Sequence, residues 1–152
     1  GSEMCIRDSI YGDGPDYAAL DSKIKQYSLH KTIHMYPATT NIQSVYLNSS
    51  IFCFPSRYEG FSMALMEAMS YGLPAIAFKC PCGPSEIIEN GINGILVENK
   101  NINDFAYELQ KLMKDEKLRE EYGIRAAMET KYKFNIDHIM KQWVSLFNDL
   151  KS

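Results

Sequence analysis

The chain has 152 residues, a length typical of one domain that can bury a hydrophobic core. Hydrophobic residues make up 45% of it and the formal net charge is −3, which excludes a broadly basic protein of the kind that binds nucleic acid or anionic lipid. Every apolar run is shorter than the roughly 18 residues of a membrane-spanning helix. The 4 cysteines are too few for a disulfide scaffold.

The first nine residues differ in character from the rest of the chain. The sequence GSEMCIRDS resembles an in-frame translation of a transposon-end adapter used to prepare sequencing libraries, because GGC TCG GAG ATG TGT ATA AGA GAC AGY encodes it in full. We interpret residues 1–9 as this artefact and exclude them from fold reasoning; a cloning scar and a native strand are the alternatives. On this interpretation, residues 10–152 are the C-terminal part of a longer protein.

From residue 10 onward, short apolar runs alternate with segments of helical periodicity, which is typical of an α/β fold with a parallel sheet. No internal linker is visible, so we expect one domain. The runs that predict strands are Ile10–Tyr11, Thr32–Tyr36, Ile51–Phe54, Pro74–Phe78 and Gly94–Val97. The segments that predict helices are Tyr17–Leu29, a helix after Asn41 with Val45 and Tyr46, Phe61–Tyr71, Pro84–Glu89, Ile102–Lys114, Glu116–Thr130 and Asn135–Leu150.

The stretch from Pro55 to Ile88 carries the chemistry. It follows Ile51–Phe54, a continuous apolar run typical of a strand buried on both faces, and its helix starts just after Glu59-Gly60. Gly60 lets the backbone approach a ligand closely, and the N–H groups at a helix start favour an anion such as a diphosphate. Such sites lie beyond the carboxyl ends of parallel strands.

Two carboxylates lie near the start of this helix, Glu59 in the loop and Glu67 in the helix, eight positions apart. At 1.5 Å per residue they are separated by roughly 9 Å along the axis, about the reach from a sugar ring to the ribose of a nucleotide sugar. Leu65, Ala68 and Met69 form the core stripe of the helix, so Glu67 is free to face a cleft. Without further context, two solvated glutamates are the simpler interpretation.

The context is the ordered set PSRYEGFSMALMEAMSYGLPAIAF, GPSEII and NGINGILV, preceded by GDGP. It resembles the donor-binding domain of family-4 glycosyltransferases, which have the two-domain GT-B architecture, and the Glu-x7-Glu motif is at the centre of the match. The resemblance covers about residues 10–150. It implies a Rossmann-like parallel sheet flanked by helices, the C-terminal half of a GT-B enzyme, incomplete at its N-terminal side.

The resemblance also implies roles for single residues. Glu59 is the expected catalytic residue, near the donor sugar and the reacting centre, acting by positioning and electrostatics and not as a nucleophile. The backbone of Gly60, Phe61 and Ser62 would hold the sugar and the diphosphate, and Glu67 would accept hydrogen bonds from the ribose hydroxyls.

Three residues after the second strand, Met35, Tyr36 and Pro37, would border the base, with Pro37 where the family more often has Gly. The last helix, with Trp143, would pack toward a missing N-terminal domain. We expect no metal and no cofactor, since the nucleoside-diphosphate sugar, UDP-linked, is a substrate. The family's basic Arg/Lys pair would lie upstream of Ile10, so we expect this chain alone to be inactive.

The implied parent is a retaining glycosyltransferase of the hexosyltransferase type. Its acceptor would be a saccharide or lipid-linked molecule bound through the missing domain, and CPCGPSEII resembles enzymes of bacterial surface polysaccharide synthesis. The expected location is the cytoplasm, including the inner face of the membrane, with no nucleic-acid partner and no transmembrane segment in this chain. The alternatives are another GT-B enzyme such as a nucleotide-sugar epimerase, a non-catalytic nucleotide-sugar binding or scaffolding subunit, and a truncated reading frame without function.

Overall fold

The computed structural model describes residues 7–150, and the chain divides into two compact units between Ile42 and Gln43. Residues 1–6 of the segment interpreted as an adapter lie outside the described residues. Its last residues, Asp8 and Ser9, belong to the first strand. The adapter interpretation therefore stays a prediction.

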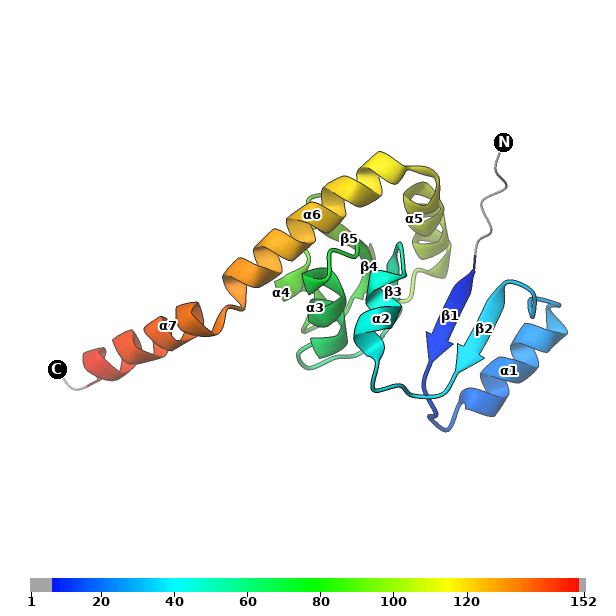
Figure 1. Cartoon of the computed structure of the whole chain (residues 1–152), viewed down its shortest axis with the longest axis horizontal. Helices are drawn as coiled ribbons and strands as arrows, with labels where there is room; N and C mark the ends of the chain where they lie inside the picture. The colour runs from blue at the N-terminus through cyan, green and yellow to red at the C-terminus, as the bar shows by residue number, and fades with distance from the viewer. Residues whose placement is uncertain (1–6, 151–152) are drawn as a thin grey trace. The chain divides into compact units, whose positions relative to one another are not determined.

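The first unit is a parallel strand pair with one helix, β1 (Asp8–Tyr11), α1 (Tyr17–Gln26) and β2 (Ile33–Tyr36). Figure 1 shows β1 and β2 side by side. In the register of the two strands Tyr11 lies opposite Tyr36, and their rings stack at 4.9 Å between centroids. Among residues 7–42 only Ile24 is buried. Helix α1 ends earlier than predicted, because Ser28 takes a left-handed φ of 56° and turns the chain.

The second unit holds a three-stranded parallel sheet in the order β3-β4-β5, together with most of the helices. Its elements, starting with a helix at the boundary of the units, are α2 (Ile42–Leu47), β3 (Phe52–Phe54), α3 (Met63–Ser70), β4 (Ala75–Lys79), α4 (Pro84–Ile87), β5 (Gly94–Glu98), α5 (Ile102–Lys114), α6 (Glu116–Lys133) and α7 (Ile136–Asp149). The predicted parallel α/β arrangement is confirmed, although the described strands form two sheets instead of one.

Strand β4 is the centre of the core. Its residues alternate between the two faces of the sheet, Ala75 and Ala77 toward one cluster, Ile76 and Phe78 toward the other. The first cluster includes Leu65 and Met69 of α3, Ile87, Ile88 and Ala126. The second includes Ile95, Val97, Leu112 and Tyr122, with Phe105 of α5 packed against it. The core therefore fixes α3 and α5 on opposite faces of β4.

The predicted burial of Ile51–Phe54 on both faces is wrong. Strand β3 forms an edge of its sheet, so Phe52 and Phe54 are half-buried and Cys53 is exposed. A continuous apolar run indicates a buried strand only when neighbouring strands lie on both sides, and among the described residues β3 pairs with β4 alone.

Two glycines let helices α3 and α6 approach closely. Gly72 ends α3 with a φ of 79°, as its position after the helix predicted. A Cβ atom at Gly123 of α6 would clash with the carbonyl group of Gly72. The backbone of α6 therefore rests directly on the turn that ends α3.

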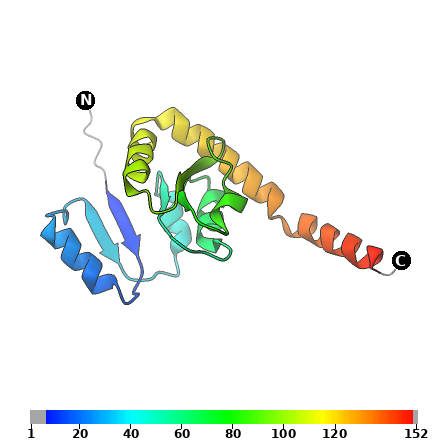
Figure 2. The ribbon, with the colours of Figure 1, turned by 180° about the vertical axis from the view of Figure 1, so that it is seen from behind.

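Helix α7 carries an unburied apolar face. Figures 1 and 2 show it leading away from the β3-β4-β5 sheet beyond the end of α6, and none of its residues is buried. Its exposed apolar residues are Ile136, Met140, Trp143, Val144, Leu146 and Phe147. The docking of this helix on another domain stays a prediction. Among the helices of residues 7–150, none is long and apolar enough to cross a membrane.

Candidate functional site

Two loops meet beyond the carboxyl ends of β3 and β4. Gly83, in the loop after β4, has a φ of 87°, and a Cβ atom there would lie 2.6 Å from Ser62 Oγ and 3.0 Å from the Gly60 carbonyl oxygen. It would also lie 3.3 Å from Glu59 Cβ. Only glycine fits this contact, so the backbone at Gly83 forms one wall around residues 59–62.

The start of α3 offers a buried hydroxyl group. Ser62 occupies the N-cap position, and the helix begins at Met63 instead of the predicted Phe61 because Ser62 has a non-helical φ of −77° and ψ of 74°. Its side chain is 1% exposed, makes no capping bond, and its Oγ has no hydrogen-bond partner in the described chain. The first turn carries no acidic side chain. A buried unpaired polar atom costs about 1–3 kcal/mol, which a bound oxygen-rich ligand would offset.

An aromatic contact fixes the residue before this hydroxyl. The ring of Phe61 meets Phe134, at the end of α6, edge to face with centroids 5.6 Å apart. Because α6 is also in close contact with the end of α3 through Gly72, both ends of α3 are held by the same helix. The loop that carries Glu59 to Ser62 is therefore attached to the core and not only to its own strand.

Glu59 is half-buried and faces the loop after β4. Burial raises the pKa of the Cys80 thiol, and the nearby carboxylate of Glu59 and the thiol of Cys82 raise this pKa further. Cys80 is 3% exposed and its thiol donates to the Phe78 carbonyl oxygen at 3.6 Å. Glu59, Ser62 and Gly83 thus come together at one end of the sheet, and the roles predicted for Glu59 and Ser62 stay predictions.

Glu67 lies on the exposed face of α3, opposite the buried stripe of Leu65, Ala68 and Met69. The prediction from the helical wheel is confirmed. The structure adds a partner that the sequence did not reveal. Tyr46 of α2, which is 5% exposed, has its pKa raised by burial and then by the charge of Glu67 and a hydrogen bond to it. Glu67 therefore lies near enough to Tyr46 to influence its ionisation. No spacing rule relates two residues on different helices, so the sequence held no signal for this pair.

The three residues predicted to border the base belong to the first unit. Met35 and Tyr36 end β2, and Pro37 follows. Met35 is half-buried, while the other two are exposed. Their contact with a base stays a prediction.

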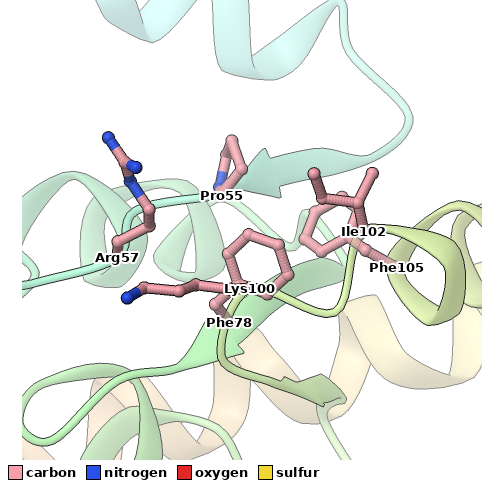
Figure 3. A pocket seen from close by; sticks show the side chains of 6 residues that line it. All are labelled: Pro55, Arg57, Phe78, Lys100, Ile102 and Phe105. Carbon is pink, nitrogen blue, oxygen red and sulfur yellow. The ribbon is translucent and has the colours of Figure 1, made fainter.

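A hollow of about 430 Å³ lies on the α5 side of the same sheet and is lined by Pro55, Arg57, Phe78, Lys100, Ile102 and Phe105 (Figure 3). In this view the side chains of Arg57 and Lys100 extend away from Ile102 and Phe105. The Arg57 carbonyl oxygen accepts a bond of 3.1 Å from the Asn99 amide. This hollow offers two cations on an apolar floor, so it is the competing location for a phosphate.

No metal centre is visible in the described part of the chain: residues 7–150 contain no group of three or more His, Cys, Asp or Glu placed to hold an ion.

Comparison with known protein families shows the family to which this chain belongs. The family described as glycosyl transferases group 1 matches residues 6–128. The chain belongs to this family. It is 36% identical over 139 residues to the amylovoran biosynthesis glycosyltransferase AmsD of Erwinia amylovora, covering 91% of this chain and 39% of that protein. It is 32% identical over 146 residues to the poly(ribitol-phosphate) alpha-N-acetylglucosaminyltransferase of Staphylococcus aureus, covering 96% of this chain and 30% of that protein.

Solved glycosyltransferase structures share the fold. The crystal structure of TarM superposes with a TM-score of 0.88 at 31% identity, over 96% of this chain and 29% of that one. A mutant of S. aureus TarM in complex with fondaparinux, alpha-GlcNAc-glycerol and UDP also gives a TM-score of 0.88, at 32% identity over 93% of this chain. This member of the family is therefore a Rossmann-like α/β structure that matches part of GT-B glycosyltransferase structures, and it spans 29–39% of the relatives named above.

Proposed function

We propose that this chain is the donor-binding part of a retaining family-4 glycosyltransferase that transfers a sugar from a nucleoside-diphosphate sugar, UDP-linked, to a saccharide or lipid-linked acceptor. The observation that supports this most is the buried, unpartnered Ser62 hydroxyl at the start of α3, enclosed by Gly83 and Glu59. A diphosphate satisfies both this hydroxyl and the positive end of the helix dipole.

The other residues of the site each contact a different part of the donor. Glu67 is placed along α3 to accept hydrogen bonds from the ribose hydroxyls, and the backbone of Gly60 and Phe61 borders the sugar. Met35, Tyr36 and Pro37 contact the base. During transfer, the bond from the sugar carbon to the diphosphate oxygen breaks with its electron pair on the diphosphate. An acceptor oxygen bonds the same carbon, and its proton passes to the departing diphosphate oxygen. Glu59 positions the sugar and stabilises the positive charge that develops on its ring.

The relatives support the biological setting. Those compared above are named as an amylovoran biosynthesis glycosyltransferase and as a poly(ribitol-phosphate) alpha-N-acetylglucosaminyltransferase, and both come from bacteria. We place the parent enzyme in bacterial surface polysaccharide synthesis, in the cytoplasm or at the inner face of the membrane. The acceptor binds mainly through another domain, against which α7 packs, and the reaction uses no metal and no cofactor.

The substitution Glu67→Ala in the complete glycosyltransferase tests the donor site. Removing an acceptor of two hydrogen bonds should raise the donor KM at least about 100-fold, since bonds to a charged group contribute about 1.5–3 kcal/mol each. Glu120→Ala is the control, because Glu120 is an exposed glutamate on α6. An unchanged donor KM in Glu67→Ala would contradict the assigned role. Donor binding without transfer or hydrolysis by the unmodified protein would favour a non-catalytic subunit.

The chain by itself should transfer no sugar. It spans 39% of its E. amylovora relative, and transfer requires both a bound acceptor and a charged partner for the diphosphate. Incubation of the purified 152-residue chain with UDP-sugars and oligosaccharide acceptors, followed by mass spectrometry, checks this expectation. A product heavier by one sugar would overturn it.

A further inference from the structure

Phe134 lies at the junction of two helices, and its backbone is fixed from both sides. It is the C-cap residue of α6, and its N–H donates to the Thr130 carbonyl oxygen at 3.0 Å. The next residue, Asn135, caps α7 with a side chain that accepts from the N–H groups of Asp137 and His138. The side chain of Phe134 is half-buried against the first cluster of the core. The core and the two helix ends therefore set the position of its ring.

A buried hydrogen-bond network also holds the last turns of α6. Asn93 is 0% exposed, and its side-chain amide donates to the Glu129 carboxylate at 2.6 Å and to the Ile87 carbonyl oxygen at 3.2 Å. Ile87 ends α4, the helix that begins directly after Gly83. The part of α6 that leads into Phe134 is thus tied to the helix that follows the Gly83 wall of the site.

The loop before α3 is irregular, in contrast to this fixed junction. Residues 55–62 contain no helix or strand, and a Cβ atom at Gly60 would meet nothing within 4 Å. Glycine leaves the backbone more conformations than any other residue, so ordering the loop at Gly60 costs the most entropy. Phe61, the next residue, is 44% exposed, and its ring meets Phe134 edge to face at 5.6 Å between centroids. This contact restrains the backbone beside Ser62.

We propose that Phe134 is a positioning residue for the nucleotide-sugar donor: its ring holds Phe61, and through it the backbone of residues 60–62, in the conformation that binds the diphosphate. This inference rests on the donor role proposed for residues 59–62. Without the contact, the loop samples several conformations, and only the fraction in the binding conformation accepts the nucleotide. The apparent Kd then rises by the inverse of that fraction. Saturating donor restores the binding conformation, so kcat is retained.

Phe134→Leu in the complete glycosyltransferase tests the inference, with UDP as the probe. Leucine keeps an apolar contact with the core and removes the ring. Because edge-to-face pairs contribute beyond their buried area, we expect the Kd of UDP from calorimetry and the donor KM to rise about three- to tenfold, while kcat stays within about twofold. Phe134→Tyr keeps the ring and should retain the original Kd. A protein that is only less stable would instead show a lower kcat, from its smaller folded fraction, at an unchanged KM.

Phe105→Leu is the matched control. Phe105 is also half-buried against the core, and its ring pairs with Phe78 at 5.0 Å between centroids, but it packs on the opposite face of β4 from the first cluster. The change should cost about as much stability in urea denaturation as Phe134→Leu and leave the Kd of UDP unchanged. An equal rise of the Kd in both variants would mean that the effect does not depend on the contact with Phe61, and it would overturn the inference.

A double-mutant cycle shows whether the effect passes through Phe61. Phe61→Leu removes the other ring of the pair, so adding Phe134→Leu to it should cause no further loss of UDP affinity. If Phe134→Leu weakens UDP binding equally with and without the ring of Phe61, the two side chains act independently and the inference is wrong.

Ser62→Ala distinguishes a failure of the inference from a failure of the proposed function. Its hydroxyl is buried without a partner in the described chain, so its removal should leave the fold intact. If Ser62→Ala weakens UDP binding and Phe134→Leu does not, the inference fails and the proposed function stands. If Ser62→Ala leaves UDP binding unchanged, the diphosphate site at the start of α3 fails, and the inference fails with it.

Discussion

The two compact units differ sharply in how much they bury. The second unit has a hydrophobic cluster on each face of β4, whereas in the described part of the first unit, residues 7–42, Ile24 alone is buried. The functional residues follow the same division. Glu59, Ser62 and Glu67 stand on elements fixed by the core, while Met35, Tyr36 and Pro37 stand on a strand pair with little packing of its own.

The composition of the strands explains this difference. Strand β4 is AIAFK, apolar on both faces, and its first four residues are buried. Strands β1 and β2 are DSIY and IHMY, with polar side chains in each, and no residue of either is buried. The free energy gained from hydrophobic burial is roughly proportional to the apolar area removed from water. Strand β4 therefore holds the residues of the site more firmly than β1 and β2 hold theirs.

The largest effect is expected from shortening one core side chain in each unit. Leu65→Ala, at a position with 0% exposure in the α3 cluster, should lower the free energy of unfolding by about 3 kcal/mol. Ile24→Ala should lower it by only about 1 kcal/mol, because its surroundings can relax around the missing methyl groups. Urea denaturation followed by circular dichroism gives both values. Equal losses would show that the two units are packed alike.

A smaller effect should follow at the contact between α3 and α6. Alanine is about 1 kcal/mol better than glycine in a helix, yet Gly123→Ala should destabilise the protein by about 2 kcal/mol, because its Cβ would meet the Gly72 carbonyl group. Glu120→Ala, at an exposed position of the same helix, should be neutral or slightly stabilising. Thermal melts of both variants measure the difference. A stabilised Gly123→Ala protein would show that α6 is not in close contact with this turn.

The smallest effect is a difference in alkylation rate between two cysteines in the loop after β4, one buried and one exposed. Cys80 is buried with its pKa raised above the ordinary 9.0, and Cys82, two positions later, is exposed. Alkylation needs the thiolate and access, so iodoacetamide at pH 8 should modify Cys82 at least about tenfold faster than Cys80. Peptide mass spectrometry after timed quenching reads both rates. Similar rates would place the loop after β4 outside the protected core.

Much of the fold could be predicted because hydrophobic periodicity is local. The helices Ile102–Lys114 and Asn135–Leu150 were located within about one residue, since Asn101 and Asn135 cap them with side-chain bonds. The edge position of β3 could not be predicted, because it depends on which strands lie beside it. The sequence also did not show that the strands would form two sheets.

Some features of the candidate site could likewise be predicted from the sequence, and others could not. The loop at Glu59 and the outward face at Glu67 follow from spacing along one helix, so they were accessible to sequence reasoning. The close approach of Gly83 to the unpaired hydroxyl of Ser62 joins segments that are 21 positions apart along the chain. Such contacts arise only once the strands have been placed side by side.

The central claim is that the start of α3 binds the diphosphate of a nucleotide sugar. A crystal structure of the complete glycosyltransferase with UDP tests it most directly. We predict a diphosphate oxygen within hydrogen-bond distance of Ser62 Oγ, and the ribose hydroxyls on the Glu67 carboxylate. A diphosphate held between Arg57 and Lys100, with Ser62 and Glu67 free of the nucleotide, would contradict the account.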